Sequence, residues 1–183
     1  MAKVGIFFGS DTGKTRKVAK QIHEALGSDA VAAPVNINKA SIDDLLACDA
    51  LILGTPTLGT GQLPGLDADC QAESWGEFVP ELESADLSGK TVALFGLGDQ
   101  QSYPDDFVSA MGELYDLVSA AGAEVVGFWS SAGYEFNSNY SLRVGISNLL
   151  DKQIYREGNA NDAGANTYNE PGRAYFASVT ASF

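Results

Sequence analysis

The chain has 183 residues, 45% of them hydrophobic, and its 11 basic and 24 acidic side chains give a formal net charge of −13. This length and apolar content suit one packed domain, and no apolar run reaches the roughly 20 residues that a membrane-spanning helix needs. The charge argues against nucleic acid and anionic membrane surfaces as partners.

In chain order, apolar runs typical of buried strands alternate with segments of helical spacing. The pattern predicts a strand at 3–8, a helix at 12–26, a strand at 30–37, a short helix from Ser41 through Leu46, a strand at 50–55, a helix at 73–82, a strand at 90–98, a helix at 105–122 and a strand at 123–130. Pro34 places the second strand toward an edge. The alternation predicts an α/β fold with a doubly wound, five-stranded parallel sheet, whose ligands would bind at the carboxyl ends of the strands.

The stretch FFGSDTGKT, residues 7–15, joins the first strand to the first helix. Unpaired N–H groups at a helix N-terminus favour an anion, and Ser10, Thr12 and Thr15 add hydroxyl donors. Gly13 allows close approach of the backbone. The spacing matches neither the mononucleotide nor the dinucleotide glycine motif, so we expect a site for one phosphate. The alternative interpretation is an ordinary capped helix.

Several longer stretches resemble the flavodoxin family. They are GSDTGKT, LILGTPTLGTGQLPG, ESWGEFVPEL, GKTVALFGLGDQQSYPDDF and GELYDLVSAAGAEVVGFWSSAGYEF, in that order along the chain. The sequence is most similar to the long-chain flavodoxins of nitrogen-fixing bacteria, from Ala2 to about Phe136. The resemblance implies a flavodoxin-like domain over residues 1–136 that binds FMN non-covalently and needs no metal.

The resemblance also implies which residues hold the FMN. It places the phosphate on the loop 10–15 and the isoalloxazine ring between the loops 55–61 and 97–103. The implied cofactor-binding residues are Ser10, Asp11, Thr12, Gly13, Lys14, Thr15, Thr55, Pro56, Thr57, Leu58, Gly59, Thr60, Gly61, Leu97, Gly98, Asp99, Tyr103 and Asp106.

Within that set, the resemblance implies distinct roles. Tyr103 would stack on the outer face of the ring, since an aromatic face suits a flat ring, and Leu58 would cover the inner face. Asp99 and Asp106 would neighbour the flavin edge and the ribityl chain. The peptide between Gly59 and Thr60 matches the one that turns over on reduction in this family, and glycine permits either orientation. Trp75 is interpreted as a packing residue.

These features predict a low-potential one-electron carrier, not an enzyme, that shuttles electrons between redox proteins and, in the nitrogen-fixing subgroup, toward nitrogenase. The acidity suits basic partner proteins, a reductase and an oxidase, and equally suits simple solubility. We expect a monomer. Two cysteines do not make a disulfide framework, and the N-terminus shows no export signal, so we expect the protein in the cytoplasm.

Two alternative functions stay open at this stage. One is an NAD(P)H:quinone reductase-like flavoenzyme of the same fold, which would need room for a second substrate over the flavin. The other is a binding module without redox activity, which would bind flavin poorly because its C-terminal residues 137–183 differ from those of the family.

The C-terminal residues 137–183 depart from the family pattern. A long-chain flavodoxin would continue with a returning strand and a final amphipathic helix, whereas residues 157–172 are rich in Gly, Asn and Asp. The stretch from about 140 to 183, including NLLDK and YNEPGR, resembles the C-terminal end of TonB-dependent siderophore receptors. We therefore expect a fusion in which an atypical tail, not an independent domain, replaces the final helix and carries no receptor function.

Overall fold

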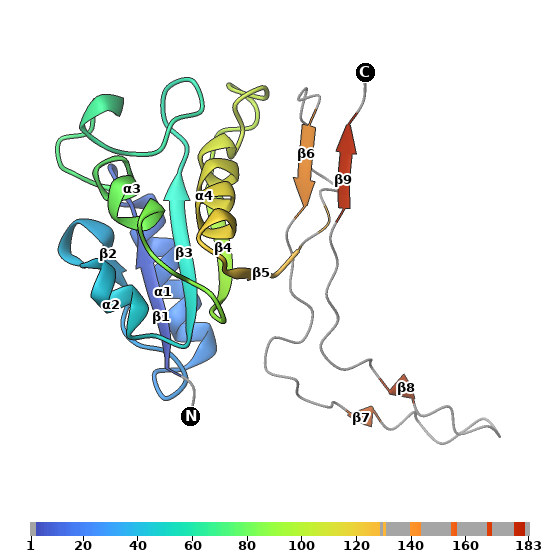
Figure 1. Cartoon of the computed structure of the whole chain (residues 1–183). Helices are drawn as coiled ribbons and strands as arrows, with labels where there is room; N and C mark the ends of the chain where they lie inside the picture. The colour runs from blue at the N-terminus through green and yellow to red at the C-terminus, as the bar shows by residue number, and fades with distance from the viewer. Residues whose placement is uncertain are drawn as a thin grey trace.

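Five apolar segments of the chain form one parallel sheet in the computed structural model (Figure 1). The structure describes residues 3–128 and 130, together with four short strands between 140 and 181. The sheet strands are β1 (Val4–Phe8), β2 (Val35–Asn36), β3 (Ala50–Pro56), β4 (Thr91–Leu97) and β5 (Glu124–Val126). Their order across the sheet is β2-β1-β3-β4-β5. This order confirms the predicted doubly wound parallel sheet and the edge position of the second strand.

Helices connect the strands, as the alternating pattern predicts. The connecting elements are α1 (Lys14–Leu26), η1 (Ile37–Lys39), α2 (Ile42–Leu46), η2 (Leu66–Ala68), α3 (Trp75–Glu83) and α4 (Ser109–Ala120). A capping box opens α2, because Ser41 N donates to Asp44 Oδ2 at 2.9 Å and Asp44 N donates to Ser41 Oγ at 3.3 Å. The last helix begins four residues later than predicted, since residues 98–108 form a loop at the sheet edge.

Alternate residues of each strand point into two separate cores. Phe7 packs with α2, α3 and α4 in the larger core, whereas Ile6 and Phe8 pack with α1 in the smaller one. Phe95 lies on the α1 side of β4 and is only partly buried. Among the described residues, α1 is the single helix packed in that smaller core. The expected replacement of the final helix concerns residues 137–183, most of which lie outside the described residues.

The described strands beyond residue 139 pair with each other. β6 (Tyr140–Arg143) runs antiparallel to β9 (Ser178–Ala181), and β7 (Tyr155–Arg156) pairs with β8 (Tyr168–Asn169). Neither pair joins the five-stranded sheet. The rest of the predicted tail lies outside the described residues. Within the described part, none of the helices has the length and apolarity required to cross a membrane.

Candidate functional site

Three loops follow the carboxyl ends of neighbouring strands and meet at one edge of the sheet (Figure 1). The first loop, Gly9–Gly13, joins β1 to α1, and the second, Thr57–Gln62, follows β3. The third loop, Gly98–Val108, joins β4 to α4. Since β1, β3 and β4 are adjacent and parallel, all eighteen sequence-predicted site residues fall at this edge or on the strand ends that reach it.

The first loop presents a helix start with free backbone donors. Gly13 has φ +85°, which suits glycine, and its N–H donates to Ser10 Oγ at 3.0 Å. The first hydrogen bond of α1 runs from Lys17 N to Gly13 O at 3.1 Å. The N–H groups of residues 14–16 therefore have no acceptor within the helix and face outward from its N-terminus. This arrangement can hold an anion through backbone donors.

Trp75 ties the first loop to the strand beside it. The Gly54 carbonyl accepts two hydrogen bonds, from Gly9 N at 2.9 Å and from Trp75 Nε1 at 2.8 Å. Trp75 is fully buried, and its ring packs edge-on against Phe78 with centroids 5.9 Å apart. A side chain at Gly9 would collide with the Trp75 ring and would stand 2.7 Å from Ser74 Oγ. Trp75 is thus a packing residue, and it fixes where the first loop begins.

The second loop is a tight hairpin turn. Leu58 N donates to Gln62 O at 3.0 Å and Gln62 N donates to Leu58 O at 2.8 Å, which closes the turn around Gly59, Thr60 and Gly61. Both glycines have positive φ, +49° and +95°. Gly59 and Thr60 are exposed, and Leu58 is half-buried. The turn therefore holds its exposed peptide on a left-handed backbone, which glycine adopts without strain.

The third loop is organised around the Asp99 carboxylate. Asp99 Oδ1 accepts from the backbone N–H groups of Gln101 and Ser102, each at 3.1 Å, and Asp99 O accepts from Tyr103 N at 2.9 Å. The hydrogen bonds from Ser102, first that of its backbone, hold the pKa of Asp99 below its ordinary value, and the positive charge of Lys14 acts in the same direction. Tyr103 follows this turn with 59% of its surface exposed.

The loops contact one another as well as the sheet. Thr57 N donates to Leu97 O at 2.8 Å, which links the second loop to the end of β4. A side chain at Gly61 would stand 3.1 Å from Ser109 Cβ and 3.4 Å from Asp106 Oδ1, so the turn packs on the start of α4. The second and third loops therefore form one continuous rim above the sheet, and the first loop is tied to the same edge through the Gly54 carbonyl of β3.

Two buried polar atoms in the second and third loops have no hydrogen-bond partner: Thr57 Oγ1 and Gln100 Oε1. A buried polar group that stays unpaired costs roughly 1–3 kcal/mol. Such a cost is commonly offset by a ligand or an ordered water at a binding site. The described residues contain no cluster of three or more His, Cys, Asp or Glu side chains that could hold a metal ion.

A cavity of about 350 Å³ opens beside the first loop. Its walls come from three places in the sequence: residues 10–12, Arg16 with Asn36 and Asn38, and residues 70–72. Cys70, one of two free cysteines, lies in this wall, and burial raises the pKa of its thiol. The cavity therefore separates the first loop from Asn36 at the end of β2.

Known proteins with this arrangement are flavodoxins. The flavodoxin family model matches residues 6–153. A flavodoxin of Klebsiella pneumoniae is 60% identical over 142 residues, covering 78% of this chain and 80% of the relative, and flavodoxin 1 of Escherichia coli strain K12 is 46% identical over 158 residues, covering 84% and 85%. The chain belongs to the flavodoxin family. A solved structure of Fusobacterium nucleatum flavodoxin bound to flavin mononucleotide has 31% identity and a TM-score of 0.66, covering 75% of this chain and 77% of that one.

The family match extends further along the chain than the quoted motifs. It reaches residue 153, beyond Phe136 and into the segment whose sequence resembles outer-membrane receptors. The alignment with the Klebsiella relative nevertheless leaves about a fifth of this chain and about a fifth of the relative unmatched. These comparisons support flavodoxin membership and lend no support to a receptor origin of the tail.

Sequence reasoning did not identify the supporting roles of Gly9, Ser74 and Gln62. Gly9 must be small because Trp75, 66 positions later in the sequence, occupies the space of its side chain. Gln62 Oε1 lies 2.7 Å from where a side chain at Gly59 would begin. The contact between Gly9 and Trp75 leaves no local signal, because it depends on how distant segments pack. Gly59 and Gln62 are only three positions apart and meet through the turn that Leu58 and Gln62 close. The glycine directly after an apolar strand is the one visible hint of close packing.

Proposed function

We infer that this flavodoxin is an electron carrier that uses non-covalently bound FMN, and that it is not an enzyme. Family membership carries the inference, and the solved relative from Fusobacterium nucleatum is bound to FMN. When bound, FMN supplies the electron-transfer chemistry. The protein supplies binding, orientation and the electrostatic surroundings, so it needs no general acid, base or nucleophile. The alternative of a quinone reductase is not favoured by any described feature.

The described residues fit FMN at the three-loop rim. We propose that the loop 10–15 holds the phosphate through its free backbone donors and the hydroxyls of Ser10, Thr12 and Thr15. Thr57 Oγ1 and Gln100 Oε1 are buried without partners at the same edge and would gain them from polar groups of the ligand. The exposed ring of Tyr103 and the half-buried Leu58 supply apolar surfaces for a flat ring system.

The remaining assigned contacts follow the same geometry. We propose that the turn of Gly59, Thr60 and Gly61 presents its exposed Gly59–Thr60 peptide to the ring edge, with Thr55 and Pro56 supporting the turn from the end of β3. Leu97, Gly98, Asp99 and Asp106 would border the ring and the sugar chain from the opposite loop, and Asp11 and Lys14 would flank the phosphate.

Titration of the flavin-free protein with FMN tests this proposal. We expect one FMN per chain, with a yellow complex and strongly quenched flavin fluorescence, because the ring would be held between Leu58 and Tyr103. Replacing Thr57 with Val should lower the affinity about tenfold by removing the unpaired hydroxyl while keeping the shape. Thr91→Val, at the opposite end of the sheet, is the matched control. Flavin-free protein that ignores added FMN would contradict the proposal.

A low reduction potential of the bound FMN is part of the same proposal. Asp11, Asp67, Asp69, Asp99 and Asp105 are exposed around the rim. Negative charge there disfavours a further negative charge on the bound group. Transfer toward nitrogenase is the physiological direction we propose, supported by the likeness to flavodoxins of nitrogen-fixing bacteria.

We further propose basic redox partner proteins, a reductase and an oxidase, that meet a monomer of this protein through its acidic rim. The charge of −13 supports long-range steering. A cytoplasmic location fits two free, unpaired cysteines.

Electron transfer to a basic cytochrome should therefore slow steeply between low and physiological salt. The double variant Asp67→Asn, Asp69→Asn removes two charges near the rim and should weaken this salt dependence. Asp29→Asn, Asp43→Asn removes the same charge elsewhere and is the control. Stopped-flow rates that do not change with ionic strength would exclude steering.

For the end of the chain, we propose that residues 1–136 form the FMN-binding domain and that residues 137–183 are a replaced terminus without a domain of its own. All proposed FMN contacts lie between Ser10 and Asp106, and the family match ends at 153. Truncation after Lys152 should accordingly leave FMN affinity within about twofold of the full chain, measured by fluorescence titration. Loss of FMN binding on truncation would show that the tail supports the site.

A further inference from the structure

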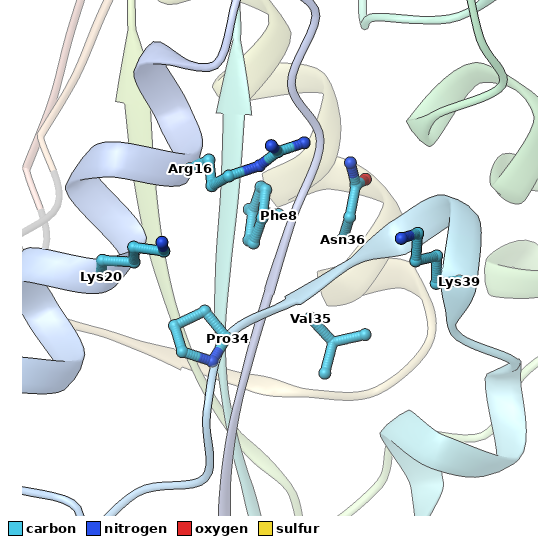
Figure 2. A pocket seen from close by; sticks show the side chains of 7 residues that line it. All are labelled: Phe8, Arg16, Lys20, Pro34, Val35, Asn36 and Lys39. Atoms are coloured by element: carbon cyan, nitrogen blue, oxygen red, sulfur yellow. The ribbon is translucent and has the colours of Figure 1, made fainter.

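A second cavity, of about 290 Å³, lies between α1 and the β2 edge of the sheet (Figure 2). Its rim carries three cationic side chains, Arg16 and Lys20 from α1 and Lys39 from η1. Figure 2 shows their charged ends turned toward the same space over Phe8. None of the lining residues is acidic.

This concentration of positive charge is unusual for so acidic a chain. Four of the 11 basic residues fall between Lys14 and Lys20, and the first turn of α1 contains no acidic residue. Positive charge near a helix N-terminus is unfavourable, because the helix dipole is positive there as well. Within the part of the chain that the structure describes, Arg16, Lys20 and Lys39 form no ion pair. The cost of this clustering would be offset by a bound anion.

The interior of the cavity differs from its rim. Phe8, Pro34 and Val35 give an apolar floor and wall, and Asn36 adds an amide that can donate and accept hydrogen bonds. A phosphate ion alone would leave this apolar surface uncovered, whereas a ligand with an aromatic base and a phosphate would use both parts. The volume is near the lower end for small-molecule pockets, about 300 Å³.

Arg16 and Asn36 also line the 350 Å³ cavity beside the first loop, so the two cavities adjoin. We propose that the cavity under Arg16, Lys20 and Lys39 binds a nucleoside monophosphate, with its phosphate on the three cations and its base on Pro34 and Val35, above the buried Phe8 ring. The ligand comes either free or as the nucleotide half of FAD, whose flavin phosphate would sit on the first loop. The site lies outside the residues proposed for FMN.

Two titrations of the full chain distinguish the two possible ligands, a free nucleoside monophosphate and the nucleotide half of FAD. In the first, AMP is added to FMN-loaded protein at low salt and followed by calorimetry. We expect one AMP per chain, with Lys20→Ala and Lys39→Ala each weakening binding about tenfold, the effect of losing one charge-assisted contact. Lys17→Ala is the matched control, since Lys17 is an exposed cation of the same helix that lines neither cavity.

In the second titration, FAD and FMN compete for flavin-free protein. If the nucleotide half of FAD is the ligand, Lys20→Ala and Lys39→Ala lower FAD affinity about tenfold and leave FMN affinity unchanged, and Lys17→Ala changes neither. The proposal is overturned if neither titration shows an effect of Lys20 and Lys39, or if Lys17→Ala weakens binding as much as they do. A chain that binds AMP but no FMN would contradict the FMN proposal alone.

Discussion

Replacing Gly9 with alanine is expected to lower FMN affinity by at least about tenfold and to destabilise the fold by about 1–3 kcal/mol. The new methyl group would collide with the Trp75 ring and stand 2.7 Å from Ser74 Oγ. Trp75 is fully buried and bonded to Gly54 O, so it cannot move aside without losing that bond. The first loop would have to move instead, and its backbone donors would shift away from the proposed phosphate position.

Gly112→Ala is the matched control for this substitution. Gly112 lies inside α4, and a side chain there would meet nothing within 4 Å. Alanine is favoured over glycine in a helix interior by roughly 0.5–1 kcal/mol, so this variant should be as stable as the parent or more stable. Fluorescence titration and thermal unfolding of both variants check the comparison. Equal FMN affinity in Gly9→Ala and the parent would show that the first loop does not depend on its packing against Trp75.

The order of strands and helices could be predicted because each element carries its own local signal. Val4–Phe8 and Ala50–Pro56 are apolar runs bounded by glycine or polar residues, and Ser41 with Asp44 forms the capping box that the sequence indicates. The start of α4 was predicted too early. Residues 105–108 have helical composition, but Val108 has φ +54°, so the helix begins after it.

The supporting contacts of the candidate site could not be predicted in the same way. Gly9, Gly54 and Trp75 come together only because β1 and β3 are neighbours and α3 packs over them. Likewise, the sequence pattern places Arg16 and Lys20 on the polar face of a helix, which indicates only an ordinary solvent-exposed surface. Lys39 reaches the same cavity from η1, after a loop and the short edge strand, and this convergence appears only in three dimensions.

Truncating the Trp75 side chain should lower the free energy of unfolding more than truncation at most other positions. Trp75→Ala removes a fully buried aromatic side chain and is expected to cost about 3–5 kcal/mol of unfolding free energy. The total free energy of unfolding of a domain of this kind is only about 5–15 kcal/mol. Trp75→Phe should cost less, because it keeps most of the packing against Phe78 and loses the bond from Nε1 to Gly54 O, while Gly9 N still donates to that carbonyl.

Added FMN should partly restore the stability of Trp75→Ala. FMN stabilises only the folded form, by about 2.7 kcal/mol at one hundred times its dissociation constant, so the unfolding midpoint should rise with FMN concentration in both Trp75 variants. Leu66→Ala is the control, since Leu66 is an apolar side chain with 51% of its surface exposed and should cost no more than about 0.5 kcal/mol. Urea unfolding with and without FMN measures all three variants. If Trp75→Ala is as stable as Leu66→Ala, the Trp75 ring does not hold the first loop against Gly54, and the expected effect of Gly9→Ala loses its physical basis as well.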